Sequence, residues 1–195
     1  DEIALIFPDA KVGRLDLDTT RGKYSHETII NQFQKQKIDI LIGTQMVSKG
    51  LDFDNVSMVG ILSADSLLRF PDFRAYERSF QLMAQVSGRA GRKNKQGKVI
   101  IQTYDVNNVI IKQVENNNFV QMYNQQLKER KQFFYPPFSR LIKITLKHRD
   151  KNVLSKISAE LADELKKIEK CKVLGPTTPV IVRIQNQFIK TILIK

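Results

Sequence analysis

Hydrophobic and polar residues follow one another along the chain in blocks whose periods predict its helices and strands. Residues 2–7 end at a proline and predict a helix end, and the alternation over residues 12–17 predicts a short strand. Apolar residues recur on one side of segment 25–36, which predicts a helix there. The apolar run over residues 38–42 has a single interruption and is typical of a buried parallel strand.

The same alternation continues after this strand. A polar loop leads to a second apolar strand, expected over residues 56–62. A helix is expected over residues 73–85 with Asp72 as its cap, and a further strand over residues 99–103. Strands that alternate with helices favour a parallel sheet covered on both faces. We therefore expect residues 1–104 to form one α/β lobe.

A helical connector is expected to follow, over residues 105–138. Apolar residues at helical spacing predict two helices, the second over residues 119–132, and two consecutive prolines then end the pattern. Tyr135 and Phe138 bracket these prolines. The two rings could stack on bases, or they could pack at a domain junction.

The remaining residues, 139–195, predict a smaller α+β domain. A strand over residues 141–146 has one polar side, and apolar residues then step by three or four from Leu154 to Ile168, which predicts an amphipathic helix. The lysines on the opposite face of this helix are Lys156, Lys166 and Lys167. Further short strands are expected at residues 173–176, 180–182 and 188–194. Because the chain stops inside a strand pattern, we expect this domain to be truncated.

The distribution of charge distinguishes the two halves of the chain. The chain has 195 residues, 42% of them hydrophobic, and a formal net charge of +12. It carries 15 basic and 12 acidic residues up to Thr103, and 17 basic and 8 acidic residues after it. The excess of positive charge in the second half suggests a surface that binds a polyanion, although a basic surface that only aids solubility would have the same composition.

The composition also disfavours several classes of site and location. Cys171 is the only cysteine, which excludes an internal disulfide and a cysteine-cluster zinc site within these residues. His26 and His148 lie far apart, so we expect no metal site. No apolar run approaches the roughly 20 residues that span a bilayer, and the N-terminus lacks a signal-peptide pattern. We therefore expect a cytoplasmic protein with no membrane partner.

The stretch from Gln85 to Arg92 is the strongest candidate for phosphate chemistry. If it is helical, Gln85, Arg89 and Arg92 recur at i, i+4 and i+7 and share one face. Gly88 and Gly91 are unfavourable inside a helix, which suggests that another group comes close. Two fork-shaped guanidinium groups beside bare backbone suit a phosphate. A solvated basic helix end, with the glycines marking its stop, is the alternative.

These motifs together resemble a known family. Residues 85–92 match the Q-x-x-G-R-x-x-R pattern, motif VI, of the second RecA-like lobe of superfamily 2 helicases, and residues 43–45 with 49–52 match the preceding motif V. The chain is further similar to the primosomal protein N prime family of replication-restart DNA helicases. The other segments that carry this resemblance are Leu41 to Met46, Asp72 to Ala75 with Glu77 and Arg78, Tyr135 to Phe138, Leu15-Asp16 with Asp18 to Thr20, and Leu174 to Pro176.

The resemblance implies a RecA-like parallel-sheet lobe followed by the smaller α+β C-terminal domain. It also implies an ATP-dependent DNA helicase that unwinds in the 3′-to-5′ direction, recognises stalled or forked replication intermediates and initiates primosome assembly. Arg89 and Arg92 would act as arginine fingers on the γ-phosphate of ATP, where they would stabilise the charge of the transition state. Gln85 would help to position the phosphate or the attacking water.

Motif V implies further ligand contacts. Asp52 would lie near the ribose of the nucleotide, and Gly50 would let the loop pass close to it. Thr44 would touch the DNA backbone, with Gln45 and Lys49 as further DNA-binding residues. From the residues alone, Thr44 could instead cap a helix and Asp52 could serve a turn.

The cofactors implied by the resemblance are shared with parts that the chain lacks. The sequence has no phosphate-binding loop of glycines followed by Lys and then Ser or Thr, so ATP and Mg²⁺ would be held mainly by a first lobe. The chain alone is therefore expected not to hydrolyse ATP. Zinc is implied only for the full-length protein.

The implied partners are forked and single-stranded DNA, the single-stranded DNA-binding protein and other primosome proteins. The family's site for the acidic tail of the single-stranded DNA-binding protein is expected near or beyond Lys195, so tail binding by this chain alone is not expected.

Two other classes of function remain open. In one, the chain is a non-catalytic nucleic-acid-binding module whose basic second half does the binding. In the other, it is a protein-interaction adaptor, whose partner binding would not depend on Lys156, Lys166 and Lys167. Only the helicase hypothesis predicts that Arg89 and Arg92 matter for turnover in the full protein while they contribute little to DNA affinity.

Overall fold

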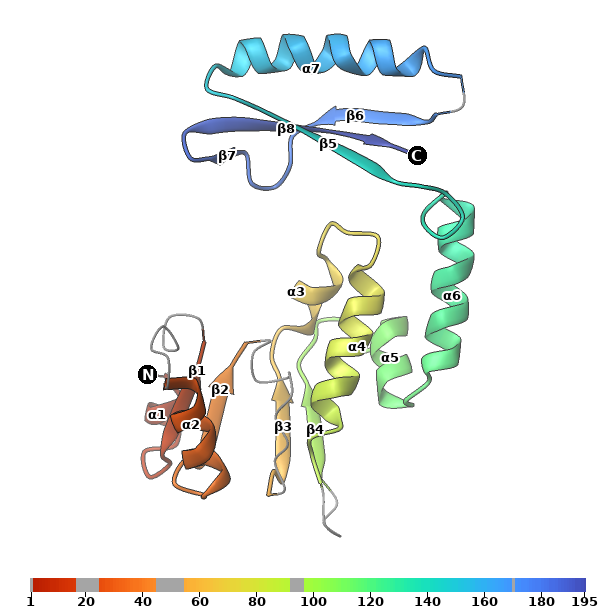
Figure 1. Ribbon diagram of the computed structural model, residues 1–195. Helices are drawn as coiled ribbons and strands as arrows, with labels where there is room; N and C mark the ends of the chain where they lie inside the picture. The colour runs from red at the N-terminus through yellow and green to blue at the C-terminus, as the bar shows by residue number, and fades with distance from the viewer. Residues whose placement is uncertain (1, 17–24, 45–54, 92–96, 170) are drawn as a thin grey trace. The chain divides into compact units, whose positions relative to one another are not determined.

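The computed structural model describes residues 2–16, 25–44, 55–91, 97–169 and 171–195. The chain forms two compact units, residues 1–123 and 124–195 (Figure 1). The first unit combines parallel strand pairs with helices, and the second combines an antiparallel sheet with one long helix. The expected order, an α/β lobe followed by a smaller α+β domain, is confirmed. Within the described residues, every helix is too short or too polar to span a bilayer.

The strands of the first unit form two parallel ladders, β1 with β2 and β3 with β4. Parallel neighbours need a crossover connection, which α2 supplies in the first ladder and α3 with α4 in the second. The elements of this part are α1 Glu2–Ile6, β1 Val12–Leu15, α2 Ser25–Gln34, β2 Ile40–Gly43, β3 Met58–Ile61, α3 Ala64–Leu68, α4 Ala75–Ser87 and β4 Lys98–Ile101. Over the described ranges, the single expected sheet is therefore two separate two-stranded sheets.

Helices do not cover both faces of β3 and β4, contrary to expectation. Met58 and Ile100 are 59% and 47% exposed, and neither strand contains a residue that is fully buried. The apolar runs over these strands predict that both faces of each strand are buried. The structure shows that an apolar strand of a small ladder can leave part of its surface open.

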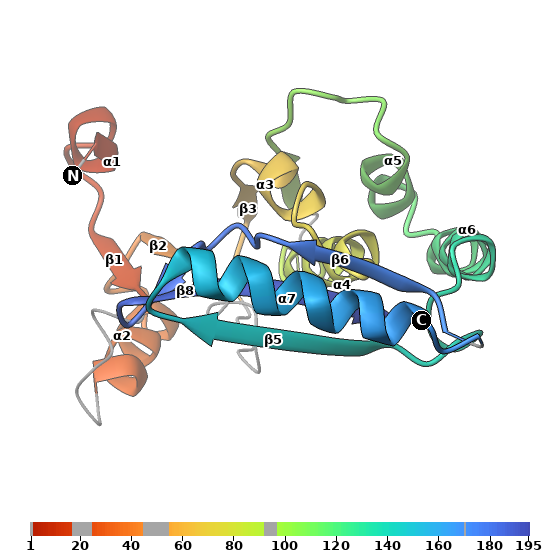
Figure 2. The same cartoon turned by 90° about the horizontal axis from the view of Figure 1, so that it is seen from above.

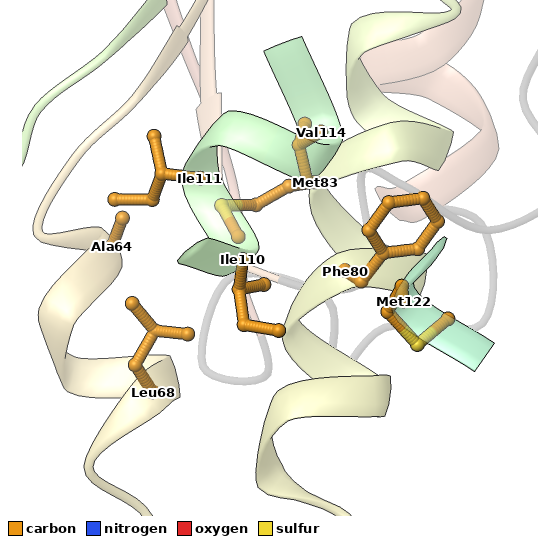
Figure 3. Close-up of a cluster of buried hydrophobic side chains, with 8 residues drawn as sticks. All are labelled: Ala64, Leu68, Phe80, Met83, Ile110, Ile111, Val114 and Met122. Atoms are coloured by element: carbon orange, nitrogen blue, oxygen red, sulfur yellow. The ribbon is translucent and has the colours of Figure 1, made fainter. Parts of the chain in front are cut away.

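The main core of the first unit lies between four helices. Its eight buried side chains point toward one another from α3, α4, α5 and α6 (Figure 3). They are Ala64, Leu68, Phe80, Met83, Ile110, Ile111, Val114 and Met122. Ile61 at the end of β3 and Ile101 at the end of β4 pack against this cluster, so the core joins the helices to the second ladder.

The helix α5 (Val109–Glu115) belongs to this core. Asn108 begins it, because its side-chain oxygen accepts a hydrogen bond from the backbone N–H of Ile110 at 3.0 Å. The next helix, α6 (Phe119–Gln132), has the expected bounds and crosses from the first unit into the second. The segment expected as a connector is therefore partly a layer of the first unit, because three apolar side chains of α5 pack against α3 and α4.

A smaller apolar cluster lies beside the first ladder. Leu15 of β1 and Ile30 of α2 are buried, and the apolar residues packed against them include Phe33, Leu41 and Val56. Val56 lies two residues before β3. Its side chain therefore links the first ladder to the start of the second.

The second unit contains one antiparallel sheet in the order β5-β8-β6, with β7 also paired to β8. The bounds are β5 Ile142–His148, α7 Lys151–Lys166, β6 Val173–Thr177, β7 Arg183–Ile184 and β8 Gln187–Ile194. The helix α7 contacts β5, β6 and β8 and runs along one side of the sheet (Figure 2). Asp150 caps it, accepting hydrogen bonds from the backbone N–H groups of Asn152 at 2.7 Å and Val153 at 3.3 Å.

Two short elements differ from the sequence prediction. Residues 180–182 do not form a strand, and the strand lies instead at Arg183–Ile184, where Ile184 pairs with Gln187 in a tight hairpin. The turn residues Gln185 and Asn186 have positive φ angles of 47° and 65°, which set this register. The short helix α3 was not predicted, because five residues contain too little periodicity to reveal a helix.

Candidate phosphate-contact site

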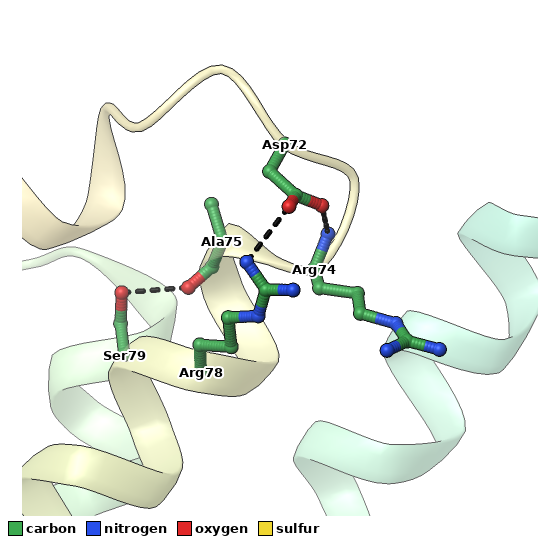
Figure 4. A network of polar contacts seen from close by, with 5 residues as sticks. All are labelled: Asp72, Arg74, Ala75, Arg78 and Ser79. Atoms are coloured by element: carbon green, nitrogen blue, oxygen red, sulfur yellow. Dashed lines mark hydrogen bonds and ion pairs between the residues drawn. The ribbon is translucent and has the colours of Figure 1, made fainter. Parts of the chain in front are cut away.

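Asp72 organises the start of α4, the helix that carries the first part of the candidate site. Its carboxylate accepts a hydrogen bond from the backbone N–H of Arg74 at 2.9 Å and another from the guanidinium of Arg78 at 2.8 Å (Figure 4). The helix begins at Ala75, and Arg74, not Asp72, occupies the cap position. Asp72 lies two residues before the cap position. It therefore stabilises the turn that leads into the helix and is not the cap itself.

One face of α4 is held against the core. Phe80 and Met83 are buried, and the hydroxyl of buried Ser79 donates a hydrogen bond to the carbonyl oxygen of Ala75 at 2.6 Å (Figure 4). A hydroxyl that bonds back to the carbonyl four residues earlier needs no other partner in an apolar environment. The opposite face is free to present side chains such as Gln85, which is exposed.

The helix ends before the arginines. Its last residue is Ser87, with Gly88 as the C-cap. The backbone N–H groups of Arg89 and Ala90 then bond to the carbonyl oxygens of Val86 and Ser87, three residues back, which is a tightened turn and not a continued α-helix. A shared face for Gln85 and Arg89 required a continuous helix, and this condition is not met because Arg89 lies beyond the last helical residue. Arg92, the third residue of that face, lies outside the described residues.

The backbone after the helix is anchored beside the start of β3. Gly91 has a φ of 72°, and its N–H donates a hydrogen bond to the carbonyl oxygen of Val56 at 3.0 Å. A Cβ atom on Gly97 would lie 2.2 Å from the carbonyl carbon of Ala90, so the two backbone segments touch. At Gly88 a Cβ atom would have only ordinary contacts, the nearest at 3.5 Å. The chain therefore approaches itself closely at Gly97, whereas the approach of another group to Gly88 and Gly91 stays a prediction.

Two of the predicted site residues lie at the C-terminal end of α4. Gln85 in the last turn of α4 is exposed, and Arg89 immediately after the helix is half-buried. Thr44 is exposed and follows the carboxyl end of β2, whereas Arg89 lies near the amino end of β3, because its neighbour Gly91 is bonded to Val56. The predicted residues that lie outside the described residues are Gln45, Lys49, Gly50, Asp52 and Arg92.

Asp65 forms a polar contact that was not predicted from the sequence. Its carboxylate accepts hydrogen bonds from the backbone N–H of Tyr104 at 3.0 Å and from the hydroxyl of Thr103 at 3.2 Å. The Tyr104 N–H is the main reason that the pKa of Asp65 is lowered, with help from Thr103 and from the positive charge of Arg69, while burial opposes the shift. A carboxylate soon after an apolar strand was the available signal, and the contact ties α3 to the segment that follows β4.

The described part of the site offers hydrogen-bond donors and no metal ligands. Gln85 contributes an amide and Arg89 a guanidinium, both of which can donate to phosphate oxygens. Within the described residues, no three His, Cys, Asp or Glu side chains gather where they could hold a metal ion. Donors of this kind can bind an anion and stabilise negative charge.

Two protein families match the chain in succession. Residues 5–94 match the family described as the helicase conserved C-terminal domain. Residues 131–195 match the family described as the primosomal protein N C-terminal domain. The first match contains β1 to α4 and the candidate site, and the second contains the antiparallel sheet with α7.

The chain is also similar to curated proteins named replication restart protein PriA. It is 41% identical over 192 residues to that of Bacillus subtilis, covering 96% of this chain and 24% of the relative. It is 39% identical over 191 residues to that of a Synechocystis species, covering 97% and 23%, and 47% identical over 137 residues to that of Chlamydia trachomatis, covering 70% and 18%. The chain thus spans a quarter or less of the length of these relatives.

Among solved structures, the chain is similar to the C-terminal domain of the DEAD-box protein Dbp5. The TM-score is 0.39 at 19% sequence identity, and the match covers 66% of this chain and 73% of that one.

Proposed function

We propose that the full-length protein is an ATP-dependent DNA helicase of replication restart. The chain matches the helicase conserved C-terminal domain family over residues 5–94 and the primosomal protein N C-terminal domain family over residues 131–195. The observation that carries the proposal is the order of the two matches on one chain. Each family match falls wholly within one compact unit, the first match in residues 1–123 and the second in residues 124–195.

In this proposal Arg89 stabilises the charge that develops on the γ-phosphate of ATP. Arg89 is half-buried, and the turn that follows it is held by the Gly91–Val56 hydrogen bond and by the contact of Gly97 with Ala90. A donor that is positioned before the reaction costs little reorganisation during it, which is why such groups are effective in transition-state stabilisation. Gln85, one turn earlier, would orient the phosphate or the attacking water, and Arg92 would be a second finger.

ATP and Mg²⁺ would be shared with a lobe outside this chain. The described residues provide donors for phosphate oxygens, while the metal ion would supply charge neutralisation between the phosphates from ligands elsewhere. Gly50 and Asp52 would contact the nucleotide, and the chain alone would not turn over ATP. A zinc site of the cysteine type would likewise require other residues, since Cys171 is the only cysteine here.

The same family matches support a proposal for DNA and partner proteins. Thr44, Gln45 and Lys49 would contact the DNA backbone, and the exposure of Thr44 after the carboxyl end of β2 supports this role. The full-length protein would act on forked and single-stranded DNA in the 3′-to-5′ direction, with the single-stranded DNA-binding protein and other primosome proteins as partners. Because chromosomal DNA lies in the cytoplasm of bacteria, a full-length protein that acts on it would be cytoplasmic.

The decisive experiment measures ATP turnover by the full-length protein on forked DNA. Arg89→Ala should lower kcat by about 100-fold or more while the affinities for ATP and DNA change little, because the lost interaction acts mainly in the transition state. Arg89→Lys should recover only part of the rate, since an ammonium lacks the fork of the guanidinium. Arg149→Ala, which removes an exposed arginine of the second unit, is the control for loss of one charge.

Unchanged turnover by Arg89→Ala would overturn the arginine-finger role. If the full-length wild-type protein itself had no DNA-stimulated turnover, the non-catalytic nucleic-acid-binding module would become the better interpretation. DNA-stimulated turnover by the 195-residue chain alone would contradict the requirement for a second lobe.

A further inference from the structure

The core-facing side of α4 ends in a serine. Ser87, the last residue of the helix, follows Phe80 by seven residues and Met83 by four, so the three residues share one side of the helix. Phe80 and Met83 are buried in the main core, among the side chains that Figure 3 shows. The residue Ser87 is half-buried, and its hydroxyl oxygen is buried. A buried polar group therefore lies at the end of the apolar side of α4, directly before the turn that carries Arg89.

Two other serines show how a buried hydroxyl in a helix is usually satisfied. Ser79, also in α4, donates a hydrogen bond to the carbonyl oxygen of Ala75 at 2.6 Å (Figure 4). Ser158 in α7 donates to the carbonyl oxygen of Ser155 at 3.0 Å. Both hydroxyls use the preceding turn of their own helix as the acceptor. Within the described residues, the hydroxyl of Ser87 has neither this bond nor any other hydrogen-bond partner.

An unpartnered hydroxyl at this position does not help the chain to fold. A buried donor without an acceptor is destabilising, because it has lost its hydrogen bonds to water and has gained none in exchange. An alanine at position 87 would avoid this loss and has a higher helix propensity. A buried polar group that is left unsatisfied in a folded protein is therefore a candidate for a role in function.

The turn after α4 contains acceptors that complement this donor. Among the hydrogen bonds of the described residues, none is accepted by the backbone carbonyl oxygen of Gly88, Ala90 or Gly91. The last carbonyl groups of a helix and of the turn after it have no partners within the helix itself. An unpartnered donor thus lies beside unpartnered acceptors, and a hydrogen bond between them would need a different arrangement of the same turn.

We propose that Ser87 is a positioning residue, which fixes the turn that carries Arg89 when nucleotide is bound. In the bound arrangement, its hydroxyl donates a hydrogen bond to one of these three carbonyl oxygens. The bond holds the backbone from which the Arg89 side chain extends, so the guanidinium is oriented before the transition state is reached. The inference rests on the proposed function, because it requires a nucleotide phosphate beside Arg89.

Binding of a phosphate can drive this rearrangement. A ligand shifts a protein between two arrangements only if it binds one of them more tightly. The guanidinium of Arg89 can donate paired hydrogen bonds to phosphate oxygens, which favours the arrangement that brings it to the phosphate. The new bond of Ser87 stabilises the same arrangement. Ser87 therefore affects the rate of the reaction through Arg89 and does not itself touch the nucleotide.

The first test is thermal unfolding of the 195-residue chain without nucleotide. Ser87→Ala should leave Tm unchanged or raise it by up to about 3 °C, because it removes a hydroxyl that has no partner. Ser79→Ala is the matched control from the same helix and should lower Tm by roughly 2–4 °C, because its hydroxyl is bonded. An equal fall in Tm for the two variants would show that the Ser87 hydroxyl already has a partner, such as an ordered water, in the free chain. That result would overturn the inference.

The second test is DNA-stimulated ATP turnover by the full-length protein. Ser87→Ala should lower kcat about tenfold and change KM for ATP by less than about twofold, because the hydroxyl orients Arg89 and does not bind ATP. Ser87→Thr keeps the hydroxyl and should recover most of the rate. Ser79→Ala should keep kcat within about twofold of wild type, although it lowers stability. A variant that is as stable as wild type but slower cannot be explained by a structural role alone.

A double variant tests whether Ser87 acts through Arg89. Two residues that act as a unit have non-additive effects, so Ser87→Ala should not slow the Arg89→Ala protein any further. If the two losses in kcat multiply instead, Ser87 acts independently of Arg89 and the inference is wrong.

The outcomes separate this inference from the proposed function. Full turnover by Ser87→Ala, together with a loss of about 100-fold in Arg89→Ala, would overturn the positioning role and leave the role of Arg89 in place. Full turnover by Arg89→Ala would overturn the proposed role of Arg89, and the inference about Ser87 would fall with it.

Discussion

The carboxylate of Asp65 at the start of α3 accepts a hydrogen bond from the backbone N–H of Tyr104, 39 residues further along the chain, at 3.0 Å. A second bond from the hydroxyl of Thr103 holds the other carboxylate oxygen. Since Ala64 and Leu68 on the same short helix are buried in the main core, this contact fixes α3 and the segment after β4 in one arrangement.

The contact predicts a pH-dependent stability. Asp65 has a lower pKa in the folded chain than its ordinary value of 3.8, chiefly because of the Tyr104 N–H. A lowered pKa contributes stability above the unfolded value and loses it as pH falls through the folded value. Asp65→Asn should therefore lower Tm by roughly 2–5 °C at pH 7, and the difference from wild type should shrink as pH falls below 3.8.

The measurement is thermal or urea unfolding at pH 7, 4 and 3. Asp163→Asn, which removes an exposed carboxylate paired with Lys166, is the control and should have little effect at any of these values. A difference between Asp65→Asn and wild type that stays constant down to pH 3 would show that the charge of Asp65 contributes nothing.

The main core predicts a second effect. Met83 is fully buried among α3, α4 and α5, so Met83→Ala should lower the free energy of unfolding by about 2–5 kcal/mol through lost burial and the cavity left behind. Met58→Ala removes the same atoms from an exposed position on β3 and should change it by less than about 0.5 kcal/mol. Urea unfolding of both variants is the measurement. Similar losses in both would contradict the assignment of Met83 to the core.

The contact between Gly97 and Ala90 predicts a third effect. A Cβ atom on Gly97 would lie 2.2 Å from the carbonyl carbon of Ala90, so Gly97→Ala requires the backbone beside Arg89 to move and should cost about 1–3 kcal/mol. Gly60→Ala is the matched control, because nothing lies within 4 Å of a Cβ atom there, and it should be neutral or slightly stabilising. Urea unfolding distinguishes the two, and a neutral Gly97→Ala would mean that the turn adapts freely.

The cap of α5 predicts a fourth effect. Asn108→Ala removes the acceptor for the N–H of Ile110 and should cost about 1 kcal/mol of stability, because that N–H has no partner within the helix. Asn107→Ala, one residue earlier and exposed, should change the stability by less than about 0.5 kcal/mol. The midpoint of urea unfolding measures both. Equal effects would show that the cap is not specific to Asn108.

The elements with long or regular patterns could be predicted from the sequence. The bounds of α6 agree with the expected residues 119–132, and β5, α7 and β8 lie where alternation and helical spacing placed them. These elements span several periods of their pattern, and their neighbours do not change where they begin and end. The expected order of an α/β lobe and an α+β domain follows from the same signals.

The candidate site was harder to predict, because its shape depends on contacts with distant residues. The spacing of Gln85, Arg89 and Arg92 would place them on one face only in a continuous helix, but the helix ends at Ser87. The chain after it is held by Val56, 35 residues before Gly91. The roles of Gln85, Arg89 and Thr44 stay predictions, as do those of the residues outside the described ranges. No local pattern indicated that Gly97 touches Ala90.

The sequence by itself determined the succession of elements, the excess of charge in the second half and the resemblance to replication-restart helicases, because each of these depends on residue type and on spacing along the chain. Only the tertiary structure decided where α4 ends, that α5 packs into the first unit, and that α7 runs along one side of the second sheet. Those features depend on contacts between residues that are distant in sequence. Such contacts are determined by packing and by the hydrogen bonding of backbone groups across the fold.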